Sequence, residues 1–238
     1  MKLDILAFGA HPDDVELGCG GTVAKEVANG KTVGIVDLTR GELGTRGTAE
    51  TRDQEASDAA TILGVTVREN LAFADGFFVN DKTHQLEIIK MIRKYRPEIV
   101  LCNAIDDRHI DHGKGSKLVS DACFLSGLLK IETELDGETQ EKWRPKQVYH
   151  YIQWKNIEPD LAVDVSEYIE TKMASVLAYK TQFYDPNSNE PQTPITSKNF
   201  TDSIKYRARD LGRLTGTEYA EGFTAERYVA VDSLFDLK

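Results

Sequence analysis

The chain has few cysteines and no long apolar run, and these absences exclude several classes of protein. Its 238 residues include three cysteines, Cys19, Cys102 and Cys123. They are an odd number and too widely spaced for a disulfide framework or a zinc-binding cysteine pair. No apolar stretch is long enough to cross a bilayer, and the N-terminus lacks the basic and apolar regions of a signal peptide. We therefore expect a cytoplasmic protein with no membrane partner.

Basic residues are also in short supply. The chain carries 29 Lys and Arg against 39 Asp and Glu, which gives a net charge of −10 and a pI near 5.1. This charge disfavours nucleic acid and anionic membrane surfaces as partners. The composition, 40% hydrophobic and 29% charged, is typical of a soluble globular protein. The length fits one well-cored α/β domain over residues 1–238 and is short for two.

Histidine is scarce as well, so the positions of the five histidines are informative. His11 follows the apolar run 3–8, which we predict to be a buried strand. His109 and His112 follow a second such run, 99–102. In open α/β sheets, ligands bind at the carboxyl ends of the strands. Three histidines therefore fall at equivalent positions where a ligand site is expected.

The other two histidines fit ordinary structural roles. His84 lies in a polar, turn-like stretch and is expected to be solvated. His150 lies in the alternating run 148–152, where a packing role is expected. We do not assign either to the site.

Two carboxylates accompany the first of these loops. Asp13 and Asp14 are adjacent, and their charges repel unless a cation or solvent relieves them. His11, Asp14 and one imidazole of the second loop form a set of two nitrogens and one carboxylate, which is typical of catalytic zinc and also accepts ferrous iron. The spacing does not say which imidazole of that loop, His109 or His112, binds the metal. The simpler alternative is that Asp13 or Asp14 caps the following helix.

Along the chain, predicted strands alternate with predicted helices. Right-handed crossovers between such strands give a mainly parallel sheet covered on both faces, a Rossmann-like three-layer α/β sandwich. In a doubly wound order the first and fourth strands are neighbours. Segment 130–146 is expected to be a surface insertion, and 185–197 a lid or a protomer contact. The predicted strands are 3–8, 32–38, 70–74, 99–102, 147–153 and 161–165, and the predicted helices are 22–28, 49–63, 86–95, 118–125, 168–183 and 201–211.

A dinucleotide-binding protein is one alternative function. Gly18 and Gly20, followed by Asp37 at the end of the next strand, loosely resemble the fingerprint of such proteins. However, Val23 occupies the position of the third glycine, and the glycines come well after the strand. We expect these glycines to let the helix approach the sheet instead.

The two loops carry a resemblance to a known family. Ala10-His11-Pro12-Asp13-Asp14, with Arg108-His109-Ile110-Asp111-His112, resembles the PIG-L/LmbE-like zinc-dependent N-deacetylases of N-acetylglucosamine conjugates. The likeness is closest to the bacillithiol-biosynthesis deacetylases, which act on N-acetylglucosaminyl malate. It extends along the chain through Gly41-Glu42-Leu43-Gly44, Arg52-Asp53-Gln54-Glu55-Ala56, Leu63-Gly64-Val65 and Tyr219-Ala220-Glu221-Gly222-Phe223.

The resemblance implies roles for the residues of the two loops. His11, Asp14 and His112 would bind zinc, with His109 beside the metal. Zinc lowers the pKa of its bound water toward about 7, so that Asp13 can accept the proton. Zinc and a protonated His109 would stabilise the oxyanion. Some members of the family also use a tyrosine, whose position here the resemblance does not give.

Neighbouring residues would support the reaction. Asp111, Asp106 or Asp107 could orient an imidazole. Arg52 and Arg108 are candidates for binding a substrate carboxylate such as that of malate, while inositol, a lipid or a free sugar remain open as aglycones.

A non-catalytic metal-binding or assembly protein is a further alternative. The acidic surface and the long polar late loop are compatible with a homo-oligomer, and a hexamer is among the orders that remain open.

Overall fold

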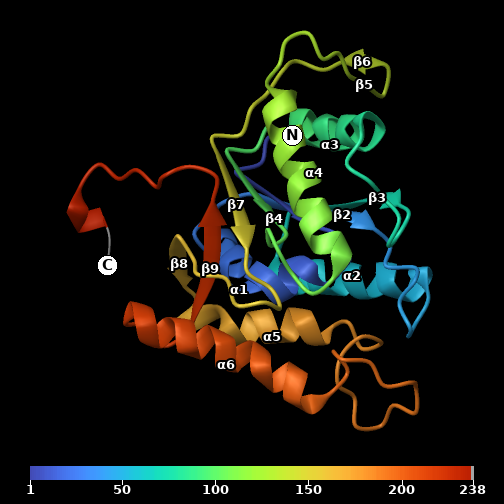
Figure 1. Ribbon diagram of the computed structural model, residues 1–238, viewed down its shortest axis with the longest axis vertical. Coiled ribbons are helices and arrows are strands. Elements are labelled where there is room, and N and C mark those ends of the chain that lie inside the picture. Colours follow the sequence, from blue (N-terminus) through green and yellow to red (C-terminus); the bar gives the residue numbers. More distant parts are fainter. Residues whose placement is uncertain (237–238) are drawn as a thin grey trace.

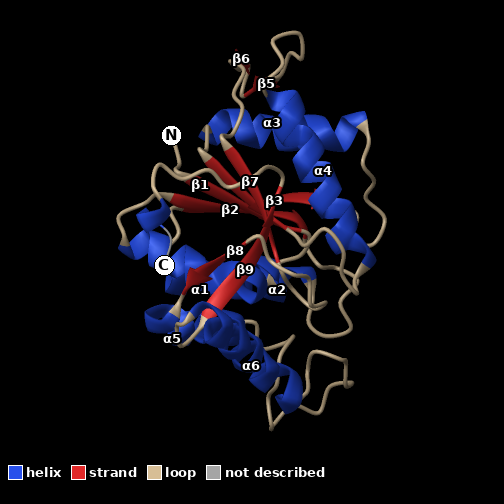
Figure 2. Ribbon diagram, turned by 60° about the vertical axis from the view of Figure 1, so that its left-hand side comes forward, coloured by secondary structure: helices blue, strands red, loops and turns tan. Residues whose placement is uncertain are grey.

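The computed structural model describes residues 1–236 and has a seven-stranded sheet between layers of helices (Figures 1 and 2). The strands run in the order β3 (Val67–Phe73), β2 (Val33–Thr39), β1 (Ile5–Gly9), β4 (Ile99–Cys102), β7 (Gln147–Tyr151), β9 (Ala220–Ala225) and β8 (Leu161–Asp164). The first five are parallel, and β9 is antiparallel to both of its neighbours. The predicted α/β class, the mainly parallel sheet and the pairing of the first and fourth strands are confirmed.

Helices cover both faces of this sheet (Figure 2). One face carries α3 (Lys82–Tyr95) and α4 (Ile110–Ser126), and the other carries α1 (Asp14–Ala28) and α2 (Ala49–Leu63), against which α5 (Ile169–Leu177) packs. The last helix, α6 (Lys198–Thr215), packs against β9.

The central strand β1 supplies side chains to both layers. Leu6 and Phe8 are buried among residues of α3 and α4, while Ile5 and Ala7 are buried on the side of α1. A strand buried on both faces is apolar at every position, which is why residues 5–8 contain no polar residue. The polar residues begin where this strand leaves the core.

Several predicted boundaries were wrong. The third strand begins at Val67 because Val67 is in register with Gly34 of β2. The predicted helix 168–183 is instead a 3-10 turn (Ser166–Tyr168) followed by α5, which ends at Leu177. The chain then turns, so that Tyr179 and Phe183 pack beside α2. Helices α1 and α4 begin earlier than predicted, at the polar loops themselves.

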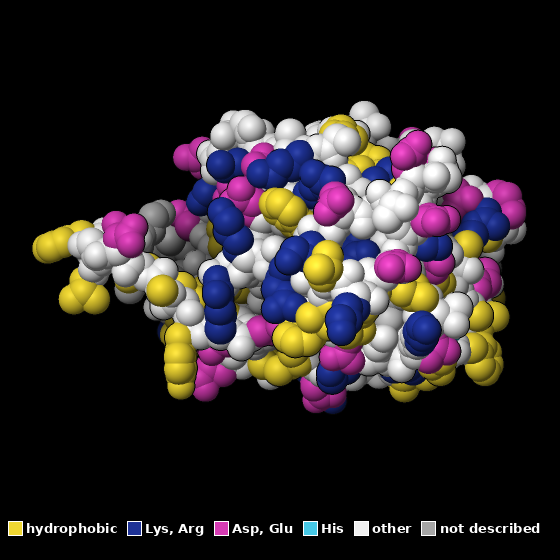
Figure 3. Space-filling view, turned by 90° about the horizontal axis from the view of Figure 1, so that it is seen from above, with side chains coloured by type: hydrophobic (Ala, Val, Ile, Leu, Met, Phe, Trp, Pro, Cys, Tyr) yellow, Lys and Arg dark blue, Asp and Glu magenta, His cyan; other side chains and the backbone are white. Residues whose placement is uncertain are grey.

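The surface insertion and the C-terminal segment complete the chain. Segment 130–146 contains a hairpin of β5 (Glu134–Leu135) and β6 (Glu138–Thr139), which lies at the end of α3 (Figure 1). A final 3-10 turn (Leu234–Asp236) lies in a segment that extends away from the body. Figure 3 shows this projection and a face on which Lys and Arg side chains gather, so the net negative charge is not uniform over the surface.

The glycines of α1 allow close packing, as predicted. A Cβ atom on Gly18 would overlap the ring of Tyr151. That ring is fully buried, and its hydroxyl donates to the carbonyl of Phe8, 2.8 Å away. Any larger residue at position 18 would therefore separate α1 from the sheet.

A buried carboxylate joins the last strand to α1. The helix is interrupted at Cys19, whose φ is −144°, so the N–H groups that follow lack their usual helical acceptors. Glu221 accepts hydrogen bonds from the backbone of Gly21 (3.0 Å) and Thr22 (2.7 Å), and pairs with Lys172 (2.5 Å). Glu221 therefore acts as an internal cap within α1.

The three cysteines are buried and unpaired, which confirms that they form no disulfide. Among the helices that the structure describes, none has the length and apolar character needed to cross a bilayer.

We expect Glu221→Ala to destabilise the protein by about 3–5 kcal/mol, because it leaves the charge of Lys172 buried without a partner. Urea-induced unfolding would measure the change. The matched control is Asp202→Ala, which breaks the exposed pair with Lys198 and should cost far less, because solvent screens exposed pairs. Equal losses in the two variants would contradict the internal cap.

Candidate metal centre

The two histidine-containing loops meet at the carboxyl ends of β1 and β4. The ring centroid of His11 lies 4.6 Å from that of His109 and 5.6 Å from that of His112. Each of the three rings offers a nitrogen, and these nitrogens lie within 4.8 Å of one another. Parallel pairing of Ile5–Ala7 with Ile99–Leu101 places the two strand ends side by side. The structure thus brings together the three histidines that the sequence singles out.

Asp14 lies between two of these imidazoles. Its Oδ2 is 3.5 Å from Nδ1 of His11, and its Oδ1 is 3.1 Å from Nε2 of His112. Two buried amides hold the carboxylate in place, because Asn103 donates to Oδ2 (2.9 Å) and Gln153 to Oδ1 (2.8 Å). Asn103 directly follows β4 and Gln153 comes just after β7, and sequence reasoning missed both.

A second carboxylate fixes the other nitrogen of His112. Nδ1 of His112 lies 2.5 Å from Oδ2 of Asp107, whose Oδ1 accepts from the backbone of Trp154 and Lys155. Imidazoles that bind a metal commonly donate their other N–H to a carboxylate, which sets the tautomer and the ring orientation. Asp107 is therefore the residue that orients His112. Asp106 pairs with the Nζ of Lys155 at the surface instead.

His11 has the same kind of support. Its Nε2 lies 3.1 Å from Asp75 and 3.4 Å from Asp111, so its Nδ1 is the nitrogen that faces Asp14. Asp111 was among the predicted orienting residues. Asp75, which comes just after β3, was missed, although a carboxylate at the end of a strand is the same signal that identified Asp13 and Asp14.

The charge balance of this cluster favours a cation. Burial opposes protonation of His112, but the charge of Asp14 and the hydrogen bond to Asp107 raise its pKa to about 9. Burial likewise opposes protonation of His11, and its hydrogen bonds to Asp111, Asp14 and Asp75 raise its pKa well above the usual value. The carboxylates therefore attract positive charge to this point. Two imidazoles and a carboxylate in such surroundings fit Zn²⁺ or Fe²⁺.

Asp13 has an unusual backbone conformation. Its φ is 113° and its ψ is −21°, a left-handed conformation that costs a residue other than glycine about 1–3 kcal/mol. Although Asp13 occupies the N-cap position of α1, its side chain makes no capping hydrogen bond, and Asp14 bonds to His11 and not to the helix. The simpler reading of these carboxylates as helix caps is not supported. Burial raises the pKa of Asp13 to about 7, against the opposing charge of Arg52.

His109 is the N-cap of α4. Its Nδ1 accepts from the backbone N–H of Asp111 at 3.3 Å, and the ring is half-buried. Burial, and then the charges of His11 and His112, lower the pKa of His109. The neutral imidazole is therefore favoured in this state, whereas the predicted role needs the protonated form.

Comparisons with known proteins agree with this site. The family described as GlcNAc-PI de-N-acetylase, or PIG-L, matches residues 6–123, which include both loops. The uncharacterized deacetylase YaiS of Escherichia coli K12 is 40% identical over 185 residues, which cover 74% of this chain and 90% of that protein. The chain belongs to the PIG-L family. The predicted resemblance is thereby confirmed at the level of the family.

Two further matches extend over nearly the whole chain. The diacetylchitobiose deacetylase of Thermococcus kodakarensis is 29% identical over 228 residues, which cover 92% of this chain and 81% of that protein. The crystal structure of the conserved protein TT1542 from Thermus thermophilus has a TM-score of 0.87 and 36% identity, and the match covers 98% of both chains. These matches also cover the strands and helices beyond residue 123.

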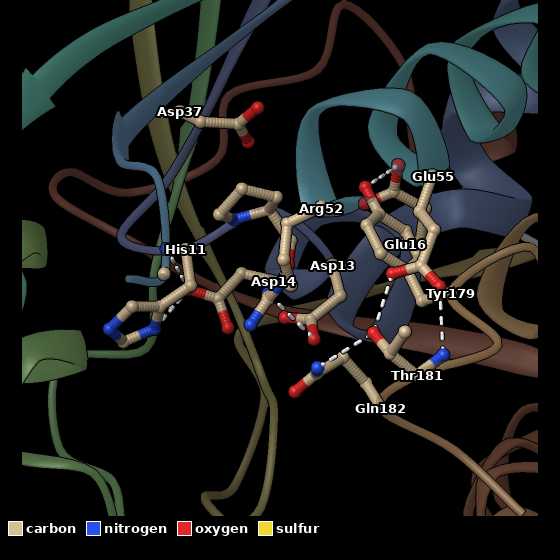
Figure 4. Close-up of polar contacts among 12 residues, drawn as sticks. His11, Asp13, Asp14, Glu16, Asp37, Arg52, Glu55, Tyr179, Thr181 and Gln182 are labelled. Atoms are coloured by element: carbon tan, nitrogen blue, oxygen red, sulfur yellow. Dashed lines mark hydrogen bonds and ion pairs between the residues drawn. The ribbon is translucent and has the colours of Figure 1, made fainter. Parts of the chain in front are cut away.

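The two predicted substrate-binding arginines of this PIG-L protein lie in different surroundings. Arg52, from α2, is 4% exposed and donates to the carbonyl of Pro12 and to the carboxylate of Asp13 (Figure 4). Arg108 is exposed, and its Cζ lies 4.7 Å from the ring centroid of Trp154. Arg108 is thus the more accessible of the two to a ligand.

A cavity of about 980 Å³ opens over the cluster. This volume exceeds the space that one sugar ring needs and lies at the upper end for ligand sites. Its walls combine the polar cluster with apolar residues of α6 and the loops before it. Tyr206 is the one tyrosine among the described residues that line the cavity. The charged residues and histidines described above that line this cavity are His11, Asp13, Asp14, Arg52, Asp75, Asp107, Arg108, His109 and His112.

The remaining two histidines lie outside this cluster. His150 is buried, as predicted, and its ring nitrogens contact Ser116 (2.8 Å) and Glu226 (3.2 Å). His84 is only partly exposed, because its ring packs 4.6 Å from that of Phe73.

We expect Asp107→Asn to weaken Zn²⁺ binding by about 10–100-fold, because the orientation and basicity of His112 depend on this carboxylate. Competition with a chromogenic chelator would measure the affinity. Asp106→Asn is the matched control, since the neighbouring Asp106 pairs only with the exposed Lys155 among the contacts described. Unchanged affinity in the Asp107 variant would contradict its role.

Proposed function

We propose that this protein is a metal-dependent N-deacetylase that hydrolyses the acetamide of an N-acetylglucosamine conjugate to a free amine and acetate. The observation that carries the proposal is the convergence of His11, Asp14 and His112 beside a further carboxylate, Asp13, at one end of the cavity. Membership of the PIG-L family and the deacetylase relatives support the same reaction.

In this proposal His11, Asp14 and His112 hold Zn²⁺ or Fe²⁺. The donor set fits, since each imidazole has an outer carboxylate on its second nitrogen and Asp14 is fixed by two amides. When bound, such an ion supplies Lewis-acid chemistry, which polarises a carbonyl and makes water more acidic.

Asp13 and His109 carry the proton transfers. Asp13 accepts a proton as the oxygen of water attacks the acetyl carbon. His109, whose ring lies 4.6 Å from that of His11, donates a hydrogen bond to the developing oxyanion once it is protonated. The C–N bond then breaks and its electron pair stays on the nitrogen. The leaving amine takes a proton either from Asp13, which received it from water, or from His109 in its protonated form.

The cavity favours a conjugate over a free sugar. Its volume leaves room beyond one ring. Trp154 lines the cavity, and one surface of its ring is covered by the ring of Phe200, 5.2 Å away, which leaves the other surface. Arg108 lies on this surface, and no carboxylate is paired with its guanidinium among the ion pairs of the described residues. An anionic aglycone is therefore expected, and N-acetyl-α-D-glucosaminyl L-malate, the substrate in bacillithiol biosynthesis, is our proposed substrate.

We expect Asp13→Asn to lower the rate of amine release by about 10²–10⁴-fold, because the amide cannot accept the proton. Metal content, measured by atomic emission after desalting, should stay at the wild-type level. Loss of the metal together with activity would assign Asp13 to the ligand set instead, and full activity would remove it from the mechanism.

Removal of the metal tests the reaction itself. We expect dipicolinate treatment to abolish amine release from N-acetylglucosaminyl malate, and Zn²⁺ or Fe²⁺ to restore it, because the ion supplies the Lewis acid. Amine is quantified with fluorescamine, and Ca²⁺ serves as the control because it prefers oxygen ligands. Turnover that persists in the chelated protein would contradict metal dependence.

A further inference from the structure

Asp13 requires an explanation beyond its role as a base. Among the described residues that line the cavity, it is the one other than glycine with a positive φ, and its side chain makes no hydrogen bond to the helix that it precedes. A strained turn of this kind persists only where surrounding contacts hold it. The direction of the Asp13 carboxylate depends on that backbone conformation.

Arg52 supplies such a contact. One guanidinium nitrogen, Nη2, donates both to the carbonyl of Pro12 and to Oδ2 of Asp13, which lies 3.2 Å away. The same group thus binds the peptide before the strained residue and the carboxylate that the residue carries. Figure 4 shows Arg52 reaching from α2 toward Asp13.

The surroundings hold Arg52 in this position. Gly41 has a φ of +64°, and a Cβ atom there would lie 2.7 Å from Nη1 of Arg52, so the glycine leaves room for the guanidinium. On another side, Cζ of Arg52 lies 6.0 Å from the ring centroid of Tyr179. The hydroxyl of Tyr179 donates to Glu16, 3.1 Å away, and Glu16 is also paired with Arg68 at 2.5 Å. This buried network therefore holds the side chain of Arg52 in place.

We propose that Arg52 is a positioning residue, which holds the Pro12–Asp13 turn in its strained conformation and aims the Asp13 carboxylate into the cavity. The inference rests on the proposed function for the role of Asp13 as the base. This positioning role differs from the role predicted from the sequence, in which Arg52 binds a carboxylate of the substrate. Arg108 is the better placed arginine for that. The Nη2 nitrogen of Arg52 is already bonded to two oxygens and its Nε is buried without a hydrogen-bond partner, whereas the guanidinium of Arg108 is exposed.

Steady-state kinetics separates the two roles. With N-acetylglucosaminyl malate and with free N-acetylglucosamine, we expect Arg52→Ala to lower kcat by roughly 100-fold for both substrates, because a misplaced base affects every substrate equally. KM should change little. Guanidinium ion at millimolar concentration should restore part of kcat, with sodium chloride as the ionic-strength control. A rise in KM confined to the malate conjugate would overturn the proposal and make Arg52 a substrate ligand.

Two other arginine variants are compared with Arg52→Ala. Arg213→Gln removes an exposed arginine on α6 that pairs with Asp210, and should leave both constants unchanged. Arg108→Gln should raise KM for the malate conjugate alone. If Arg52→Ala does not fold, Arg52→Lys keeps the charge and the aliphatic stem, and the same loss of kcat with a constant KM is expected.

A crystal structure of Arg52→Gln tests the inference without turnover. We expect the φ of Asp13 to become negative and its carboxylate to turn from the cavity, while His11, Asp14 and His112 stay in place. An Asp13 that keeps its left-handed conformation would overturn the proposal. Absence of amine release by the wild-type protein would count against the proposed function alone, because this readout concerns the backbone of Asp13.

Discussion

The parallel pairing of β1 with β4 is the constraint on which the site depends. Ile5–Ala7 and Ile99–Leu101 are in register, so the chain leaves the sheet at neighbouring points before His11 and before His109. These loops are about a hundred residues apart in sequence, and no local propensity brings them together. The apolar character of both strands does so, since each is buried between two helical layers and can pair in only one register. A shift by one residue would reverse the faces of Leu6 and Phe8 and separate the imidazoles.

Buried charges on the α1 side of the sheet lie in ion pairs. Arg68 is paired with Glu16 (2.5 Å) and Asp37 (2.7 Å), and Lys172 is paired with Glu221 (2.5 Å). Each ion pair joins elements that are far apart in sequence. Such pairs add little net stability compared with apolar packing, but breaking one leaves an uncompensated charge. Their value here lies in fixing where α1 and α5 sit relative to the sheet, and therefore where Asp13 and Asp14 lie at the start of α1.

The sequence predicts the parts of this protein that follow from short patterns. Apolar runs ending in polar residues identify β1 and β4, and the rarity of histidine makes His11, His109 and His112 conspicuous. Asn103, Gln153 and Asp75 could not be found with the same certainty, because each is a common polar residue whose role depends on contacts across the sheet. The helix predicted over 168–183 failed for a similar reason. Tyr179 and Phe183 are compatible with a helix, but packing against Ala56 and Ala59 of α2 determines their conformation.

The geometry of the loops also separates the proposed metal ligands from the proposed base. The candidate ligands are fixed by groups at strand ends, since Asp107, Asp75, Asn103 and Gln153 each bond to His11, Asp14 or His112. Asp13 is fixed from the opposite side, by an arginine of α2. Because Asp13 and Asp14 are consecutive and differ in backbone conformation, their carboxylates are held by different neighbours. Adjacent residues with like charge can then take different roles: one carboxylate compensates a cation, and the other remains free to exchange a proton.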